Sequence, residues 1–476
     1  MLRKSVLEEH IEEQLVKMCA LVLIGYSAIN KLDLLLFPGS RCIRSEEIFL
    51  LFLFIQFVLF INYLFLVDFP VKIYSSKSFK KIIMISTEVN PVVEERLIKT
   101  THNLPPVKDT AHMQQRLFSL DALRGFDMFW IMGAEAIFHT LAKATGSPFW
   151  AAVGNQFTHP DWNGFHLYDL IFPLFLFLSG VATPYSVGRE LEKGKSKSQL
   201  LLRVVKRALI LVLLGIVVNN GLQIKPFHEI RFASVLGRIG IAYMFANIIY
   251  LYSGRVAQIV WFLSLIIGYW LLLKFNAAPG FAPGDLTMQG NFASYIDRLI
   301  LPGKLYLGIH DPEGLASTIP AISTGLLGIL AGTLLRNEAM GQQKKALYLA
   351  IAGLVFLALA QLWNLDFPIN KNLWSSSFVL HVGGLSLLLL SLFYYVIDVL
   401  GYKQWAFFFK VIGMNSILIY ISGKFINWQY TANGFFKWLG QLFGNPYDVV
   451  VMAICFVAVK WLFLYFMYKK KIFLRV

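Results

Sequence analysis

Histidine and carboxylate side chains gather in one stretch of this chain, NQFTHPDWNGFHLYDLIFPLFLFLSG, which runs from 155 to 180. His159 is the strongest candidate for proton transfer, because imidazole accepts and returns a proton near neutral pH. Asp161 and Asp169 follow in the same stretch, and either carboxylate could orient the ring and stabilise its charged form. The sequence leaves that choice open. The structural alternative is a polar loop that turns the chain and caps the apolar helix after it.

Two charged residues lie inside apolar stretches that can cross a membrane. Glu135 stands in IMGAEAIF, and a carboxylate buried there must be protonated, paired or exposed to water. Arg238 stands in LGRIGIAY and needs a partner, such as Glu135, Asp169 or a phosphate group. Intramembrane charges of this kind predict a functional site. For Arg124, in SLDALRGFDMFW, an interfacial charge at a helix start is the favoured explanation from local sequence.

Three further segments place polar side chains in or beside apolar runs. HDPEGLAST contributes Asp311 and Glu313 at a predicted turn and helix start, where an anion could also bind. NKNLWSSS contributes Asn370 and Asn372, amides beside an aromatic ring, a composition suited to sugars. Asn415 lies inside an apolar run, in GMNSILIYISG, where tight helix packing is the alternative explanation.

The composition indicates that the chain is a membrane protein. The chain has 476 residues, of which 57% are hydrophobic and 15% charged, whereas about 25% are charged in soluble domains. Apolar segments long enough to cross a bilayer recur from Arg116 onward. They predict an all-α, polytopic transmembrane bundle of about ten core spans, at 125–143, 166–187, 202–219, 234–252, 257–274, 317–335, 346–363, 375–398, 407–423 and 449–468.

Residues 1–112 differ in character from the rest. Two apolar runs, at 16–37 and 48–67, could add one or two hydrophobic helices, and the polar stretch 72–106 is typical of a linker. We therefore predict an N-terminal extension over 1–112 and a transmembrane domain over 113–476. The alternative for the extension is a mispredicted start, with translation beginning at Met113.

The basic residues cluster in alternate loops of the core. This pattern is the positive-inside signal, so it explains the net charge of +15 without a nucleic-acid partner. It predicts that both ends of the core are cytoplasmic and that the His159 loop lies on the opposite side. Cys19, Cys42 and Cys455 are too few for a zinc site or a disulfide framework. The absence of Walker, HExxH and GxSxG motifs argues against nucleotide-driven transport, metal-dependent hydrolysis and a serine hydrolase.

Several motifs in a fixed order resemble the heparan-α-glucosaminide N-acetyltransferase family, in particular its bacterial branch. Between about Arg116 and Tyr468 the order is RLFSLDALRGFDM, HPDWNGFHLYDLIFPLFLFLSG, LGRIGIAY, HDPEGLASTIPAI, INKNLWSSSFVL and GMNSILIYI. The resemblance implies a membrane-bound acyltransferase that moves an acetyl group from acetyl-CoA, its co-substrate, to an amino sugar or glycan. It implies no metal. It also implies that His159, in the family's H-x-x-WNG context, is the active-site histidine, with Trp162 and Asn163 beside the acceptor.

The resemblance carries further expectations. Arg124 and Arg238 would hold CoA phosphates, and Glu135 stands where the family has an asparagine tied to the site. His159 would either deprotonate the acceptor or carry the acetyl group itself. A bacterial member would lie in the cytoplasmic (inner) membrane with His159 on the periplasmic side. Members of the family often form dimers, so the resemblance also implies a possible homodimer.

Two other functions remain open. A transporter or permease would use Glu135, Asp169 and Arg238 as an ion or substrate relay, because intramembrane charges are what transporters use. The inverted repeats with paired broken helices that mark many transporters are not evident in the sequence. A scaffold for an envelope complex is the third alternative.

Overall fold

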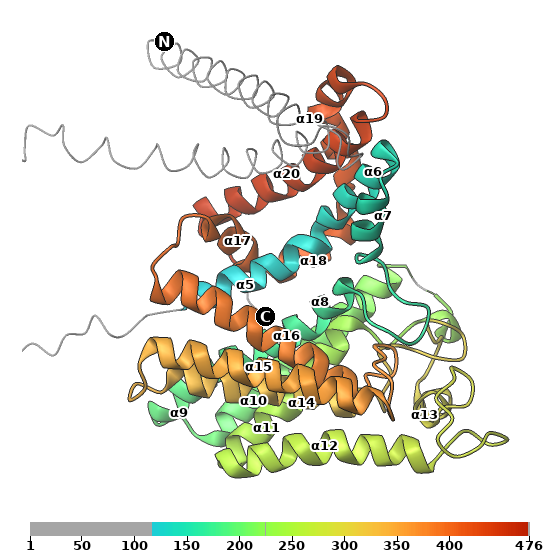
Figure 1. Ribbon diagram of the computed structural model, residues 1–476, viewed down its shortest axis with the longest axis vertical. Helices are drawn as coiled ribbons and strands as arrows, with labels where there is room; N and C mark the ends of the chain where they lie inside the picture. Colours follow the sequence, from blue (N-terminus) through green and yellow to red (C-terminus); the bar gives the residue numbers. More distant parts are fainter. Residues whose placement is uncertain (1–116, 224, 475–476) are drawn as a thin grey trace, which may run out of the picture. The chain divides into compact units, whose positions relative to one another are not determined.

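The computed structural model describes residues 117–223 and 225–474 (Figure 1). The predicted N-terminal extension and its two apolar runs lie outside the described residues, so both remain predictions. The helices belong to one compact unit that begins at Phe118. No β-strand forms within the described ranges, where two isolated bridges, Arg231 with Gly303 and Ala277 with Asn291, are the only extended pairings. The all-α fold class is thereby confirmed.

Most of the predicted apolar segments form helices that can cross a membrane. Within the described ranges, seven are long and apolar enough by length and composition. They are the α8 region (167–192) and α11 (Val235–Tyr252), α12 (Arg255–Phe275), α14 (Thr318–Arg336), α15 (Gln342–Asn364), the α16 region (376–399) and α20 (Asp448–Lys469). The pair α17 (Ala406–Gly413) and α18 (Ser416–Phe425) qualifies as an eighth if it is one span bent by 65°.

The other two predicted spans form helices that are less apolar or interrupted. α10 (Lys197–Asn220) carries Arg203, Lys206 and Arg207 in its first half. The first predicted span consists of α5 (Phe118–Phe129), η2 (Trp130–Ala134) and α6 (Glu135–Thr145). It bends at Gly133, whose φ of 121° suits a residue without a side chain. The count of about ten spans therefore remains a prediction.

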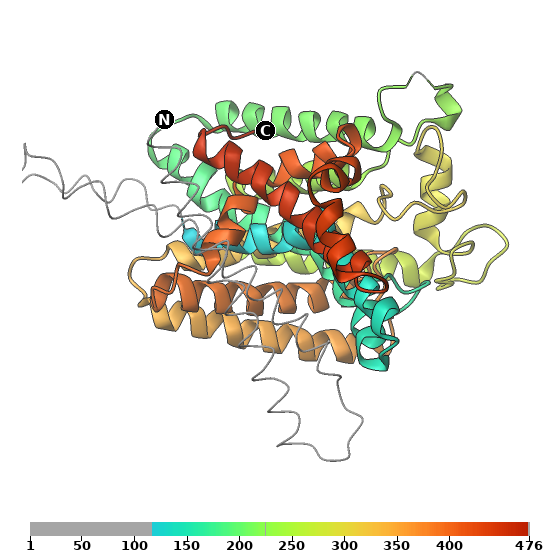
Figure 2. The same ribbon diagram turned by 90° about the horizontal axis from the view of Figure 1, so that it is seen from above.

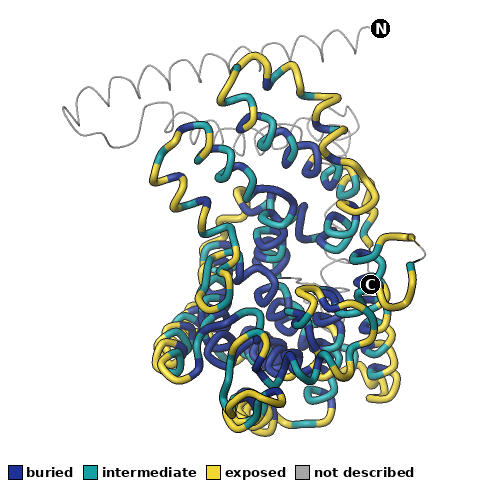
Figure 3. The backbone as a smooth tube through the Cα atoms, turned by 90° about the vertical axis from the view of Figure 1, so that its right-hand side faces the viewer, coloured by how far each residue is buried: buried dark blue, intermediate teal, exposed yellow. Residues whose placement is uncertain are grey.

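Shorter elements complete the chain. They are α7 (Pro148–Asn155), η3 (Leu167–Leu170), α8 (Ile171–Thr183), η4 (Pro184–Gly188), α9 (Arg189–Glu192), η5 (Phe227–Glu229), α13 (Phe292–Ile300), α16 (Ser376–Phe393), η6 (Tyr394–Val399) and α19 (Trp428–Phe443). The long helices run side by side (Figures 1 and 2). α8 and α14 are the most buried of the apolar helices, while α12 and α15 expose much of their surface (Figure 3).

The contact between α8 and α14 depends on glycine. A Cβ atom on Gly328 of α14 would lie 2.0 Å from the carbonyl oxygen of Phe177 on α8, and one on Gly180 would lie 2.1 Å from the oxygen of Gly325. Real Cβ atoms do not approach so closely, so the two backbones touch only because side chains are absent. Small residues at helix interfaces are typical of membrane bundles, in which close backbone packing replaces hydrophobic driving force.

The chain order brings the chemically interesting loops to one end of the bundle. α8, α11, α14 and α16 all begin at this end, where the loops before them meet the turn that follows α7. In Figure 1 this end, with α13, lies at the right, and α9 lies at the other end. The loops at the α9 end carry most of the basic residues, as the charge pattern predicts. Which end faces the cytoplasm remains a prediction.

Candidate active site

His159 and Asp169 form a hydrogen-bonded pair at the start of the α8 region. Asp169 lies in the first turn of η3, where its Oδ2 accepts the backbone N–H of His166 at 3.0 Å, as in a capping box. This bond fixes the carboxylate and leaves Oδ1 to His159, whose Nδ1 lies 2.7 Å away. The Asp169 side chain is fully buried, whereas about half of the His159 side chain is exposed. A buried acid thus orients an accessible imidazole.

The structure decides between the two carboxylates that the sequence left open. Asp161 is exposed, and among the described residues it forms no hydrogen bond or ion pair with His159. Residues 161–164 form a run of bends, and Gly164 at its end has a φ of 117°. Asp169, which is more distant in sequence, is the partner because the capping interaction brings the loop back over η3.

Lys371 is a member of this cluster that the sequence analysis missed. Its Nζ lies 3.2 Å from Oδ1 of Asp169 and 3.2 and 3.3 Å from Nδ1 and Nε2 of His159. Burial lowers the pKa of Lys371, although the neighbouring Asp169 carboxylate opposes that shift. One sequence signal could have identified Lys371. This lysine is the only charged residue in the segment NKNLWSSS, which lies on the side of the core where basic residues are sparse.

Hydrogen bonds tie the His159 loop to the Lys371 loop. Nδ2 of Asn370 donates to Oδ1 of Asn163 at 3.0 Å, and the backbone N–H of Gly164 donates to the carbonyl of Ile369 at 2.9 Å. Oδ1 of Asn370 also accepts the N–H of Leu373 at 2.8 Å and so fixes its own turn. Asn163 and Asn370, which are both predicted to bind the acceptor, are therefore brought together and bond to each other.

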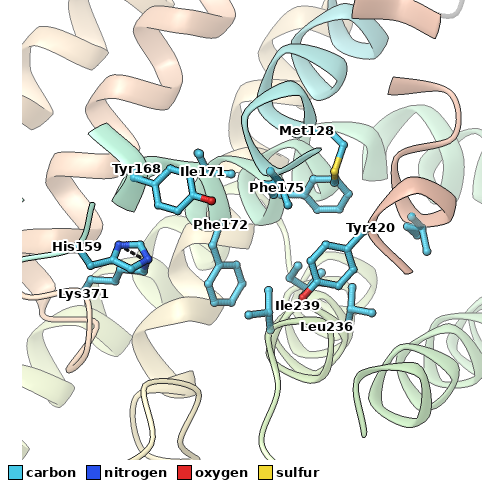
Figure 4. A pocket seen from close by; sticks show the side chains of 13 residues that line it. Met128, His159, Tyr168, Ile171, Phe172, Phe175, Leu236, Ile239, Lys371 and Tyr420 are labelled. Atoms are coloured by element: carbon cyan, nitrogen blue, oxygen red, sulfur yellow. Dashed lines mark hydrogen bonds between the residues drawn. The ribbon is translucent and has the colours of Figure 1, made fainter. Parts of the chain in front are cut away.

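An apolar pocket extends from this cluster into the bundle (Figure 4). It has about 640 Å³ of empty space, part of it open to solvent. His159 and Lys371 lie on one side, and Tyr420 and Met128 lie on the other. The lining residues come from α5, η2, η3, α8, α11, α18 and the two loops: Met128, Ile131, His159, Tyr168, Ile171, Phe172, Phe175, Val235, Leu236, Ile239, Lys371, Ile417 and Tyr420. Tyr168 and Tyr420, which supply hydroxyl groups to this wall, were also missed from sequence.

Asp311 and Glu313 both pair with Arg231, in front of α14. Nε and Nη2 of Arg231 lie 2.9 and 2.7 Å from the two carboxylate oxygens of Asp311, and Nη2 also bonds Glu313. Burial alone would raise the pKa of Asp311, but the hydrogen bonds and charge of Arg231 outweigh it and lower the pKa. These two predicted substrate ligands thus serve at least to hold the loop before α14 against the loop before α11.

Arg238 lies fully buried in the first turn of α11, at the same end of the bundle. Its Nη2 donates to the carbonyl of Gly314 at 3.2 Å and to Ser317, and its guanidinium lies 4.9 Å from the ring centre of Trp374. Its Nε and Nη1 have no hydrogen-bond partner among the described residues. The carboxylates of Glu135 and Asp169, which the sequence suggested as partners, form no ion pair with it in this part of the chain.

Trp162 packs onto a second, buried histidine. Its Nε1 donates to the carbonyl of Leu286 at 2.9 Å, and its ring lies edge-on to His310 with centroids 5.2 Å apart. Nδ1 of His310 lies 2.7 Å from the hydroxyl of Ser294, and the backbone of Asn372 reaches the same ring. Burial lowers the pKa of His310 to about 4. Trp162 and Asn372 are therefore positioned through His310.

Three predicted site residues form no hydrogen bond or ion pair with His159, Asp169 or Lys371 in the described part of the chain. Glu135 opens α6 next to Lys460 of α20, whose Nζ donates to the carbonyl of Met132 at 2.7 Å where the helix bends. Arg124 pairs with Asp121, one turn earlier on α5, at 3.2 Å. Asn415 separates α17 from α18, and its side-chain amide binds the backbone of Ile472 and Leu474 near the C-terminus.

The fold and the site together define a multi-pass helical membrane protein with a histidine–aspartate pair at the mouth of an apolar pocket. A family model described as a domain of unknown function (DUF5009) matches residues 116–284. Human heparan-alpha-glucosaminide N-acetyltransferase is 28% identical over 447 residues, which cover 82% of this chain and 66% of the human protein. The mouse protein of the same name is 29% identical over 442 residues, 80% of this chain and 65% of its own length.

The chain thus spans about two thirds of the length of the curated relatives that it matches. These matches confirm the resemblance to the heparan-α-glucosaminide N-acetyltransferase family that the ordered motifs indicated.

Proposed function

We propose that the protein is a membrane acetyltransferase that takes an acetyl group from acetyl-CoA and transfers it to an amino sugar or glycan. The observation that carries this proposal is the His159–Asp169 pair at the mouth of an apolar pocket. A carboxylate bonded to one ring nitrogen orients the imidazole so that the other nitrogen can act as a base. The names of the curated relatives describe the same class of reaction.

The reaction that we propose is a direct transfer. With Nδ1–H of His159 donating to Asp169, Nε2 takes the proton from the acceptor amine as its nitrogen attacks the thioester carbonyl. The new C–N bond forms, the C–S bond breaks, and the leaving CoA thiolate recovers the proton from His159. Attack of His159 itself on the thioester, with an acetyl-histidine intermediate, is the alternative route.

The pocket walls suit the uncharged part of the donor. Met128 of α5 and Ile131 of η2 line the pocket, and Arg124 lies one turn before Met128 on the same face of α5. The chain runs from α5 through α7 to His159, so Arg124 lies toward the opposite end of the bundle. We therefore assign the CoA phosphates to Arg124 and the basic loops at that end. Arg238, enclosed at the His159 end, is better suited to the acceptor side.

The acceptor would approach from the loop end, beside Trp162 and Asn163. In a bacterial cytoplasmic membrane this end would face the periplasm, as the positive-inside pattern predicts. The donor would enter from the cytoplasm and the acceptor from outside, with His159 where the two meet.

The test uses the full chain purified in detergent. Acetyl-CoA binding is measured by titration calorimetry, and free CoA is measured after a set of amino sugars is added. Wild type should bind acetyl-CoA and release CoA, and His159→Ala should retain binding but lose release. His228→Ala is the matched control, because His228 is an exposed histidine in another loop.

Failure of folded wild-type protein to bind acetyl-CoA or CoA would refute the proposal. Transport would then be the better hypothesis, because Glu135 and Lys460 place two ionisable side chains near each other inside the bundle. Flux of a charged solute into proteoliposomes, lost in Glu135→Gln, would support it.

A further inference from the structure

Lys371 contacts both members of the His159–Asp169 pair. Its Nζ lies 3.2 Å from Oδ1 of Asp169 and almost equally far from the two ring nitrogens of His159 (Figure 4). Only 19% of the Lys371 side chain is exposed. A cation in this position interacts with the imidazole as a whole, and not only with the carboxylate.

The turn that carries Lys371 is rigidly built. Asn370 bonds the N–H of Leu373, and the N–H of Trp374 donates to the carbonyl of Lys371 at 3.0 Å. Trp374 has a φ of 53°, a left-handed conformation that is unfavourable for a bulky residue. It is held there by its burial, with Phe172 and Phe378 against its ring. Backbone strain of this kind is retained where surrounding contacts enforce it, and such sites are frequently functional.

Charge explains what the lysine does. A carboxylate beside an imidazole stabilises the protonated ring, and a protonated ring cannot act as a base. An ammonium at the same distance has the opposite effect. We propose that Lys371 is a third functional residue of this site, whose ammonium holds His159 in the neutral form that can accept a proton.

The other charges around Lys371 do not cancel this effect. Besides Asp169, the groups that act on its charge are Glu313, which opposes its deprotonation, and Arg238, which favours it. Glu313 already pairs with Arg231, and Arg238 lies behind Trp374. Among the described residues, the charged groups in contact with the His159 ring are Asp169 and Lys371, and the titratable ring of Tyr168 lies beside it with centroids 5.1 Å apart.

The charge on His159 can be tested without any substrate. Diethyl pyrocarbonate acylates an imidazole ring only in its neutral form. The pH dependence of the reaction at His159, followed by peptide mass spectrometry, therefore reports the neutral fraction of this ring. About half of the His159 side chain is exposed and therefore open to the reagent. His228, which is well exposed, serves as the internal reference in every sample.

Removal of the ammonium should make His159 protonate more readily. In Lys371→Met the midpoint of the reaction at His159 should move to higher pH, because no ammonium then opposes protonation of the ring. Lys371→Arg, which keeps the charge, should follow wild type, and Asp169→Asn should move the midpoint the other way. Lys304→Met, at an exposed lysine in another loop, is the matched control.

A midpoint in folded Lys371→Met that coincides with wild type would overturn the proposal. If Lys371→Met does not fold, Lys371→Gln and the opposite shift in Asp169→Asn decide instead. If the midpoint shifts in neither Lys371→Gln nor Asp169→Asn, the proposal is likewise overturned.

The role of the Lys371 charge in catalysis rests on the proposed function, and it is tested separately through the pH dependence of acetyl transfer. Because burial lowers the pKa of Lys371, acetyl transfer should decline on the alkaline side at a lower pH than an ordinary lysine would impose. In Lys371→Arg the alkaline loss of acetyl transfer should occur at higher pH than in wild type, because a guanidinium stays charged. If wild type transfers no acetyl group, the proposed function fails, while the acylation profile still decides the role of Lys371.

Discussion

Replacement of Asp169 by asparagine removes one charge and almost no volume. Oδ1 of Asp169 accepts bonds from His159 at 2.7 Å and Lys371 at 3.2 Å, and Oδ2 accepts the N–H of His166 at 3.0 Å. An asparagine oxygen can keep the last of these. The two charge-assisted bonds contribute roughly 1.5–3 kcal/mol each, and breaking a buried pair while its partner remains costs about 3–5 kcal/mol. We expect a loss of stability of about 3 kcal/mol or more.

Activity should respond even more strongly than stability. In hydrolase triads the same carboxylate-to-amide change lowers turnover by about 10⁴, because the imidazole takes the wrong tautomer. A loss of this order in CoA release, at saturating acetyl-CoA, is expected for Asp169→Asn. Stability is measured as the thermal melting of detergent-solubilised protein, and activity as CoA released.

Asp161→Asn is the matched control, because Asp161 belongs to the same loop but is exposed. It should melt with wild type and keep its turnover. A larger loss in Asp161→Asn than in Asp169→Asn would refute the assignment of Asp169 as the partner of His159.

Two further predictions concern packing and pH. Gly328→Ala should destabilise the protein by about 2 kcal/mol or more, because its Cβ would meet the carbonyl of Phe177; Gly268→Ala, with open space around it, should not, and equal melting of the two variants would contradict the packing argument. Burial lowers the pKa of His310 to about 4 from 6.5, so folding keeps it neutral where the unfolded chain is protonated, and its contribution to stability is lost as pH falls from 6.5 toward 4. The cost of His310→Asn, which removes the bond to Ser294, should therefore be smaller at pH 5 than at pH 7.5; a cost that does not change with pH would be evidence against a neutral His310.

The helices could be predicted from sequence because lipid imposes a simple rule. An apolar stretch of about 20 residues must satisfy its own backbone bonds, so length and hydropathy suffice to place it. The breaks were harder to foresee. Gly133 and Asn415 interrupt helices whose apolar pattern continues through them, and the interruption depends on Lys460 and on the C-terminal segment, which are distant in sequence.

The site was predictable only in part. Sequence identified His159 and both candidate carboxylates, but the choice of Asp169 depends on the capping bond to His166, a local geometry that spacing does not encode. Lys371 joins the site across more than two hundred residues, and no periodicity points to such a contact. The sequence predicts a carboxylate or phosphate partner for Arg238, whereas its hydrogen bonds go to Gly314 and Ser317, and its guanidinium lies over the Trp374 ring.

The backbone contact between α8 and α14 also bears on how the molecule can move. Two helices that touch through Gly180 and Gly328 have no side chains between them to rearrange, so they are expected to shift together as one stiff body. The opposite wall of the pocket, with Ile417 and Tyr420, belongs to a helix already broken at Asn415. A ligand too large for the resting pocket would therefore find the least resistance there, with Asn415 as the hinge and the C-terminal segment as its tether.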